Sequence, residues 1–381
     1  MKIVIVGAGY AGLMCAFRLR RLCRERAEIT VVDRSDRFVE RVRLHEFIRG
    51  APAPAHELAP MLRAHGVHFV RGSLAAIDRE RKRALVGDQS LEYDRLVLAL
   101  GSRTDRRIPG ALEHALDFDR AVQVRENILS MTAGHIVVIG AGLTGIEAAS
   151  ELREARPELD VSLVFRGQFA PMLSEPARRH ARSTLEALGV RVRSGLAVRA
   201  FERGAIVTDD ASIPCDLALN CAGFAAPGEL ASLGLAVDRA GFARVDPWLR
   251  SVTDSAISVI GDAASVEGHE ALHKSCKTAM PLAAHCADVL YAELSQRAPE
   301  PFRYRDTGVC VSLGRSQAVI QSYRDGRAPE GRVLTGRLAI WLKEAIVRYT
   351  TWSIRAEASR RFAYRWLSPK SVPTIAAQTA S

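Results

Sequence analysis

The chain is poor in lysine, in paired cysteines and in long apolar runs, and each shortage excludes a class of protein. Only six of its 53 basic residues are lysines, so arginine supplies nearly all of the positive charge. The seven cysteines are odd in number and show no Cys-x-x-Cys spacing, which argues against a disulfide framework and a zinc site. No apolar run reaches the length of about 18 residues that spans a bilayer. We therefore expect a cytoplasmic protein with no metal site.

The net charge of +10 is concentrated near the C-terminus. Between Gly331 and Ser381, nine basic residues stand against two acids, Glu344 and Glu357, which leaves +7 in this stretch. A basic segment suits nucleic acid, an anionic membrane or an acidic ligand. No recognition helix, RNA-binding motif or basic–aromatic platform is present, so we expect no nucleic-acid partner. The nine basic residues are Arg332, Arg337, Lys343, Arg348, Arg355, Arg360, Arg361, Arg365 and Lys370.

An internal repeat organises the chain. KIVIVGAGYAGLMCAFRL at 2–19 recurs as HIVVIGAGLTGIEAASEL at 135–152. Each copy reads as an apolar strand, a G-x-G-x-x-G turn and a helix, the context in which the glycines admit a pyrophosphate and the helix N-terminus receives its charge. Two copies in this context predict two dinucleotide-binding sites. Their glycines are Gly7, Gly9 and Gly12 in the first copy and Gly140, Gly142 and Gly145 in the second.

The residue that ends the second strand differs between the two copies. Asp33 lies 21 residues after Gly12, and Arg166 lies 21 residues after Gly145. An acidic side chain here binds a ribose 2′-OH, whereas an arginine suits a 2′-phosphate. We expect Asp33 to hold an adenosine ribose and Arg166 to favour NADPH over NADH. The alternative for Arg166 is a solvated arginine in an arginine-rich chain.

Three further apolar strands end in small residues. The segments are 93–102, 216–224 and 257–264, and they contain Gly101, Gly223 and the pair Gly261 and Asp262. Open α/β sheets bind ligands at the carboxyl ends of their strands. We expect these residues to contact a cofactor.

Taken in order and spacing, these motifs resemble the pyridine nucleotide–disulfide reductase superfamily of flavoproteins over about residues 1–300. Within it the chain is most similar to type II NADH dehydrogenases, on RVRLHEFIRG at 41–50, KSCKTAMPLAAHCADVL at 274–290 and WLKEAIVRYTTW at 341–352. The resemblance implies an α/β fold with two Rossmann-like domains and a small C-terminal α+β domain. It implies FAD at the first glycine turn with Asp33 and Asp262, and NAD(P)H at the second, with Glu147 near the contact between nicotinamide and flavin.

The expected domain limits follow from where the second repeat begins, from Val245-Asp246-Pro247 and from the linker at 298–301. The FAD-binding domain comes in two pieces, 1–115 and 245–300, and the NAD(P)-binding domain occupies 116–244. The C-terminal domain, with a basic amphipathic helix, covers 301–381.

Two departures from the family pattern bear on the electron acceptor. The segment 41–50, where disulfide reductases carry their redox cysteines, contains none. Electrons must then pass directly to an external acceptor, which excludes glutathione, lipoamide and thioredoxin reductase activities. Where type II dehydrogenases show A-Q-x-A-x-Q, this chain has CKTAMP at 276–281. The missing glutamines weaken the case for a quinone.

We therefore predict an FAD-dependent oxidoreductase that passes electrons from NAD(P)H to a small acceptor, a quinone or a quinone-like compound. Two alternatives stay open: a biosynthetic FAD enzyme acting on a dedicated metabolite, and a non-catalytic redox-sensing or interaction flavoprotein. Glu147 is the candidate for proton handling. His45, at the position of the relatives' cysteines, is a second catalytic candidate that either faces the flavin or is a partly exposed helix residue.

A helical stripe of apolar residues runs through the basic C-terminal segment. Three interpretations stay open: the helix packs on the flavin domain, it packs on a second subunit in a homodimer, or it lies on an anionic membrane at the inner face. The stripe consists of Leu338, Trp341, Leu342, Ala345, Ile346, Tyr349 and Trp352, flanked by Arg348 and Arg355.

Overall fold

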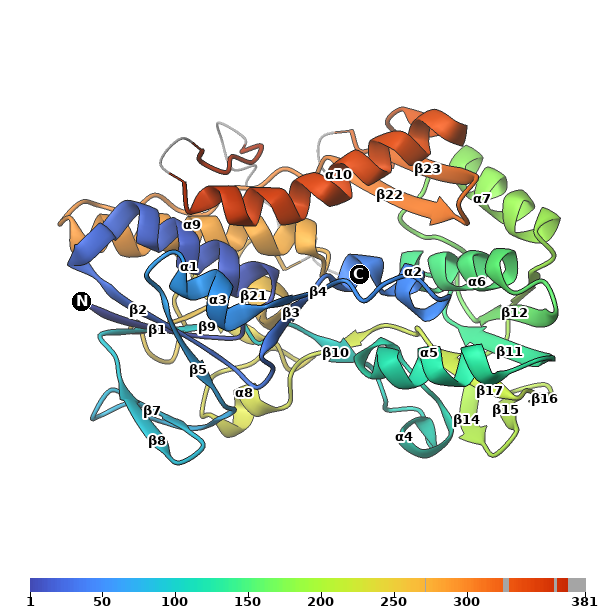
Figure 1. Ribbon diagram of the computed structural model, residues 1–381, viewed down its shortest axis with the longest axis horizontal. Coiled ribbons are helices and arrows are strands. Elements are labelled where there is room, and N and C mark those ends of the chain that lie inside the picture. The colour runs from blue at the N-terminus through green and yellow to red at the C-terminus, as the bar shows by residue number, and fades with distance from the viewer. Residues whose placement is uncertain (271, 325–328, 360–361, 369–381) are drawn as a thin grey trace, which may run out of the picture.

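The computed structural model describes residues 1–270, 272–324, 329–359 and 362–368. It shows two α/β units side by side, with a long C-terminal helix laid across both (Figure 1). The predicted α/β class, with two Rossmann-like domains and a smaller C-terminal α+β part, is confirmed. Arg360, Arg361 and Lys370, three of the nine basic residues, lie outside the described residues.

The first unit is built on a parallel sheet with the strand order β20-β9-β1-β2-β5. Its central strands are buried on both faces, as their unbroken β-branched sequences require. Helices α1 and α9 pack against each other over one face of the sheet (Figure 1). The bounds are β1 Lys2–Val6, β2 Glu28–Asp33, β5 His68–Arg71, β9 Arg95–Leu98, β20 Ile257–Val259, α1 Tyr10–Cys23, α3 Leu58–Arg63 and α9 Cys276–Leu294.

The second unit lies in sequence between β9 and β20, so the first unit is discontinuous. Its parallel sheet has the order β13-β12-β11-β17, and the turn from β11 into α6 repeats the turn from β1 into α1. Two short antiparallel strands, β10 and β18, pair where the chain leaves and re-enters the first unit. The bounds are β10 Arg103–Thr104, β11 Gly134–Ile139, β12 Leu159–Phe165, β13 Arg191–Ser194, β17 Leu217–Asn220, β18 Phe224–Ala225, α5 Ala121–Ser130, α6 Leu143–Ala155 and α7 Glu175–Ala187.

Small excursions complete the two units. Antiparallel sheets β6-β7-β8 and β14-β15-β16 belong to them, and two further pairs form, antiparallel β3 with β4 and parallel β19 with β21. The bounds are β3 Arg37–Val39, β4 Ala55–Glu57, β6 Leu74–Asp78, β7 Arg83–Val86, β8 Gln89–Glu92, β14 Val198–Glu202, β15 Ala205–Thr208, β16 Ser212–Pro214, β19 Ala243–Val245, β21 Ala264–Val266, α2 Leu44–Ile48, α4 Ala111–His114 and α8 Glu229–Ser232; the 3-10 turns are η1 Arg24–Arg26, η2 Arg41–Arg43, η3 Phe118–Arg120 and η4 Gly261–Ala263.

The C-terminal part joins the two units. The sheet β22-β23-β24 packs on α6 and α7 of the second unit, and helix α10 runs from this sheet to α1 of the first (Figure 1). Two ion pairs hold the C-terminal end of α10. The fully buried Glu357 lies 3.1 Å from Arg18 and 2.8 Å from Arg21. The bounds are β22 Gly308–Leu313, β23 Gln317–Ser322, β24 Val333–Thr335 and α10 Gly336–Glu357.

Two further observations concern the chain as a whole. All seven cysteines are free thiols. Within the described ranges, no helix combines the length and the apolar character needed to cross a bilayer.

Candidate cofactor and electron-transfer site

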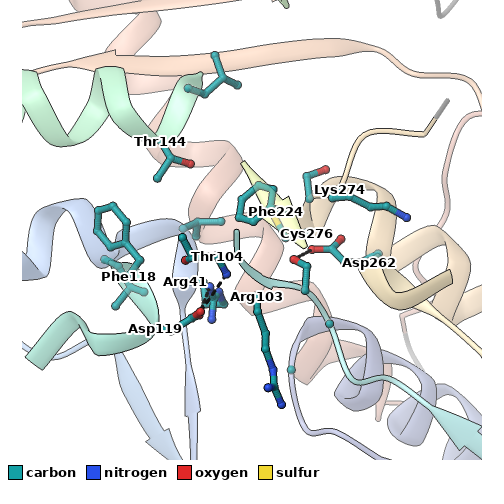
Figure 2. Close-up of a pocket in the computed structure, with 18 of the residues that line it drawn as sticks. Arg41, Arg103, Thr104, Phe118, Asp119, Thr144, Phe224, Asp262, Lys274 and Cys276 are labelled. Carbon is teal, nitrogen blue, oxygen red and sulfur yellow. Dashed lines mark hydrogen bonds and ion pairs between the residues drawn. The ribbon is translucent and has the colours of Figure 1, made fainter. Parts of the chain in front are cut away.

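One cavity of about 2210 Å³ opens along the carboxyl ends of both parallel sheets. Pockets for single small molecules are typically about 300–1,000 Å³, so this one has room for more than one cofactor. Both glycine turns line it, together with Asp33, Asp262 and Glu147. Figure 2 shows that the residues at one end of the pocket, Asp262 and Lys274, come from the first unit.

The first glycine turn combines two packed glycines with one that faces open space. A Cβ on Gly7 would lie 2.2 Å from the Ala99 carbonyl oxygen, and a Cβ on Gly12 would lie 1.8 Å from the oxygen of Gly7. Side chains are therefore impossible at both positions. A Cβ on Gly9 would meet no atom within 4 Å. This is the position where the backbone is left bare for a ligand to approach.

The second turn repeats this pattern. A Cβ on Gly140 would lie 2.6 Å from the Cys221 carbonyl oxygen, and one on Gly145 would lie 1.9 Å from the oxygen of Gly140. Gly142 again has nothing within 4 Å. The two turns are thus built alike, each at the N-terminus of a helix whose free N–H groups can receive a phosphate.

Asp33 and Arg166 occupy equivalent positions beside the two turns. The Asp33 carboxylate accepts hydrogen bonds from the Ala8 N–H at 2.7 Å and the Ser35 N–H at 2.8 Å, which fix it next to the first turn. Arg166 follows the last residue of β12, is exposed and lines the cavity. The structure thus places an acid at one strand end and a base at the other, as the sequence predicted.

The carboxyl group of Asp262 has one satisfied and one unsatisfied oxygen. Its Oδ2 accepts a hydrogen bond from the Ser102 hydroxyl at 2.8 Å, while its buried Oδ1 has no hydrogen-bond partner among the described residues. Burial raises the pKa of this carboxyl group. A buried acceptor without a donor at a cavity wall suits a ligand hydroxyl. Gly101, Gly223 and Gly261 line the same cavity, each with φ in the left-handed region.

An ion pair joins the two units at this cavity. Arg41, on the η2 turn of the first unit, lies 2.9 Å from Asp119, on the η3 turn of the second (Figure 2). Asp119 also accepts the Thr104 N–H at 3.0 Å. Although burial opposes ionisation, Arg41 and this N–H hold the pKa of Asp119 below its usual value. The pair helps to fix the spacing of the two glycine turns.

Glu147 is the centre of a buried polar cluster on the cavity wall. Its Oε1 lies 3.0 Å from the Lys343 ammonium and accepts the Ser312 N–H at 3.0 Å. Its Oε2 lies 3.6 Å from Nδ1 of His45. Burial raises the pKa of Glu147, but Lys343, His45 and the Ser312 N–H outweigh it and hold the pKa below its usual value. The carboxylate is therefore ionised at neutral pH.

Sequence reasoning named two members of this cluster and missed the other two. His45 is only 4% exposed and lines the cavity. This excludes the alternative in which His45 is a partly exposed helix residue. Lys343 was counted only as one charge of the basic segment, and Ser312 was not singled out. One signal for Lys343 is present in the sequence: lysine is rare in this chain, with only six among 53 basic residues.

Most of the apolar stripe of α10 faces outward, while two of its members, Ile346 and Tyr349, also line the cavity. Leu338 is 61% exposed, Trp341 69% and Trp352 54%, whereas Lys343 and Glu357 are buried. Leu338, Trp341 and Trp352 therefore do not pack on the flavin domain. A second subunit and a membrane surface stay as the two candidates for covering the stripe.

Fold and cavity together define a class of protein: an enzyme with two dinucleotide-binding units in which NAD(P)H reduces FAD. Residues 1–287 match the family described as pyridine nucleotide-disulphide oxidoreductase. The chain belongs to this family, for which FAD and NAD(P)H are typical cofactors.

Named relatives cover most of the chain. Demethylphylloquinone reductase NdbB from Synechocystis is 28% identical over 92% of this chain and 93% of its own length. Type II NADH:quinone oxidoreductase from Staphylococcus aureus is 27% identical over 91% and 94%. The fold matches the sulfide:quinone oxidoreductase of Aquifex aeolicus, with a TM-score of 0.79 at 18% identity over 93% and 92% of the two chains. It also matches NDH2 of Plasmodium falciparum in complex with NADH, with a TM-score of 0.78 at 14% identity over 94% and 96%.

Proposed function

We propose that this chain transfers electrons from NAD(P)H, through FAD, to a small quinone or quinone-like acceptor. The observation that carries the proposal is the single cavity that joins both glycine turns to the Glu147 cluster. The absence of cysteine from 41–50 supports direct transfer to an external acceptor. Two relatives that cover most of the chain are named as quinone reductases.

The residues present fit the two cofactors. We assign FAD to the turn at Gly9, with Asp33 for its ribose and the unsatisfied oxygen of Asp262 for a hydroxyl of its chain. We assign NAD(P)H to the turn at Gly142, where α6 brings Glu147 to the cavity wall. When bound, FAD accepts a hydride from the nicotinamide and passes two electrons to the acceptor.

The protein's own groups orient the reactants and handle protons. The glycine turns hold the two pyrophosphates at helix N-termini, which aligns the reactive rings within one cavity. Glu147 is the proton-handling group, and Lys343 holds its carboxylate in place at 3.0 Å. The buried ammonium also presents positive charge to the cavity, which favours an acceptor that gains electron density.

An anaerobic stopped-flow experiment tests the proposal. We expect the purified protein to be yellow, to bleach rapidly with NAD(P)H, and to regain its colour with short-chain quinones. Rapid bleaching with poor reoxidation by every quinone would favour the biosynthetic enzyme. Negligible bleaching with either nicotinamide would favour the non-catalytic flavoprotein. A protein that binds no FAD, natively or after reconstitution, would contradict the whole assignment.

The preference for NADPH rests on Arg166 and is tested in the same experiment. We expect NADPH to bleach the flavin at lower concentration than NADH. Arg166→Glu should reverse this order, because a carboxylate repels a 2′-phosphate and binds a 2′-hydroxyl. Arg203→Glu is the control, because Arg203 is also exposed but does not line the cavity. Unchanged NADPH kinetics in the Arg166 variant would remove the proposed role.

We further propose that the outward stripe of α10 lies on an anionic membrane, at its inner face. Two tryptophans and a tyrosine suit the interface, and Arg337, Arg348 and Arg355 are exposed beside them. Because Arg348 is paired with Glu344, only Arg337 and Arg355 are counted as attracting the membrane. At about 1 kcal/mol each, they favour binding to the anionic membrane by about 30-fold.

Vesicle co-sedimentation distinguishes the membrane from the homodimer. We expect the parent protein to bind vesicles that contain phosphatidylglycerol and to bind pure phosphatidylcholine vesicles more weakly. The double variant Trp341→Ser/Trp352→Ser should bind neither kind of vesicle. Sedimentation velocity of the same two proteins gives the other outcome. A dimer that the double variant turns into a monomer, without vesicle binding by the parent, would assign the stripe to a second subunit.

A further inference from the structure

The proposed reaction needs one proton from water in every turnover. NAD(P)H supplies a hydride, which carries two electrons and one proton, whereas a quinone becomes a hydroquinone by taking two electrons and two protons. The balance is NAD(P)H + H⁺ + quinone → NAD(P)⁺ + hydroquinone. The second proton must reach the acceptor in the cavity beside Glu147, and the inference drawn from this need rests on the proposed function.

We propose that Glu46, His45 and Glu147 form a proton relay from the protein surface to the acceptor cavity. Glu46 takes a proton from water and gives it to Nε2 of His45. His45 releases the proton on Nδ1 to Glu147, and Glu147 delivers it to the oxygen of the acceptor. Each group gains one proton and loses one, so the relay itself ends unchanged apart from the tautomer of the ring.

The imidazole ring of His45 stands between two carboxylates. Its Nδ1 lies 3.6 Å from Oε2 of Glu147, and its Nε2 lies 3.9 Å from Oε1 of Glu46. The Ser312 hydroxyl, 3.4 Å from Nε2, keeps the ring in this orientation. Each gap closes to a hydrogen bond when the side chains move by about 1 Å. The two ring nitrogens thus lie toward opposite ends of one path, Nδ1 toward Glu147 and Nε2 toward Glu46.

The outer end of the path reaches solvent through Glu46. This carboxylate has 16% of its side chain exposed and lies 3.2 Å from Arg43 and 3.4 Å from Arg315. Arg315 is 41% exposed. The same guanidinium nitrogen of Arg315 lies 3.1 Å from Glu151, one helical turn after Glu147. The outer end therefore holds two carboxylates around one exposed arginine.

The charges that face His45 come from every element packed on it. Burial lowers the pKa of His45; Glu147 on α6 and Glu46 on α2 oppose this, while Lys343 on α10 and Arg315 after β22 add to it. The ring is therefore neutral at pH 7 and offers one donor and one acceptor nitrogen. A neutral imidazole between two carboxylates can pass a proton without ever holding a buried charge for long.

The test compares two acceptors in the FAD-loaded protein. A quinone needs the proton, whereas ferricyanide takes electrons alone. In His45→Gln and Glu46→Gln, we expect flavin bleaching by NAD(P)H and ferricyanide turnover to fall far less than quinone turnover. Quinone turnover should fall on the order of 100-fold, the usual contribution of a positioned proton-transfer group, with a larger solvent isotope effect in D₂O. In His45→Ala, added imidazole should restore part of the quinone rate.

Glu344→Gln is the matched control, because it removes a carboxylate that pairs with Arg43 but does not line the cavity. It should leave both acceptors unaffected. Quinone turnover equal to the parent in both relay variants would overturn the relay alone. Equal slowing with quinone and ferricyanide would also overturn it, because the defect would then lie in the flavin site. A parent protein that reduces ferricyanide but no quinone would overturn the proposed function and the relay together.

A second measurement does not depend on turnover. In ¹³C-histidine-labelled protein, the resonance that His45→Gln removes reports the titration of His45. Glu46→Gln and Glu147→Gln should each lower the pKa of this residue, since both carboxylates favour the charged ring. A titration that neither substitution moves would show that the ring faces neither carboxylate, which contradicts the relay.

Discussion

A methyl group at Gly142 should weaken the binding of NAD(P)H and leave the binding of FAD unchanged. Gly142 has φ −74° and ψ 176°, extended backbone that alanine adopts freely, and a Cβ there meets no atom within 4 Å. Gly142→Ala should therefore fold normally, with stability within about 0.5 kcal/mol of the parent. The added methyl projects into the space that we assign to the pyrophosphate of NAD(P)H.

The size of the effect follows from overpacking. A methyl forced against a well-fitted neighbour costs about 1–3 kcal/mol, which corresponds to about 5- to 150-fold weaker binding. We expect the concentration of NAD(P)H that gives half the maximal bleaching rate to rise by this factor, while the ratio of FAD to protein stays unchanged. Gly9, at φ −76°, also tolerates an alanine, and Gly9→Ala should lower the ratio of FAD to protein.

Gly228→Ala is the control, because Gly228 is exposed, has φ −60°, meets nothing within 4 Å and lies outside the cavity. It should leave both cofactors unaffected. Loss of FAD from the Gly142 variant, with NAD(P)H binding intact, would show that the assignment of the two turns is reversed. Unchanged binding of both cofactors in both variants would refute the reasoning, since no phosphate would then approach the bare glycines.

Two further predictions concern stability, measured by urea unfolding of the FAD-loaded protein. Burial raises the pKa of Glu151 from 4.5 to about 7; the folded state then binds more protons, so stability should fall by about 3 kcal/mol as the pH rises from 4.5 to 7. Glu151→Gln should abolish this dependence of stability on pH. Parallel plots of stability against pH for the parent and the variant would contradict the prediction. Glu357→Gln should lower the free energy of unfolding by about 3 kcal/mol, because it leaves the buried Arg18 and the half-buried Arg21 short of a carboxylate. Glu344→Gln, in a more exposed pair, should cost less than about 1 kcal/mol, and equal losses would refute the distinction.

Local sequence predicted the cofactor turns because their geometry is encoded within about twenty residues. A β-branched strand, three glycines at fixed spacing and a helix can adopt few arrangements, and the contacts that require Gly12 and Gly145 lie within the turns themselves. The positions of Asp33 and Arg166 are predictable for the same reason, since Asp33 ends the next strand of its unit and Arg166 directly follows the corresponding strand of the other.

The Glu147 cluster could be predicted only in part, because its members come from four separate elements. Glu147 lies on α6, His45 on α2, Ser312 on β22 and Lys343 on α10. A side chain's partner across such distances depends on how whole units pack, and no local pattern contains that information. The hydrogen bonding of Asp262 is of the same kind, since its satisfied oxygen depends on Ser102, 160 residues earlier.

Sequence by itself determined that this chain builds two dinucleotide units in one repeat, lacks a redox cysteine pair at 41–50, and ends in a basic helix with an apolar stripe. Only the tertiary structure decided which way that helix faces. Periodicity defines a stripe but not what covers it. In α10 the buried face includes Lys343 and Glu357, each satisfied by a buried charge, while Trp341 and Trp352 face outward. The buried face also carries Ala339 and Ile354, so ion pairs formed with distant elements and a small apolar contact together set the orientation of the helix.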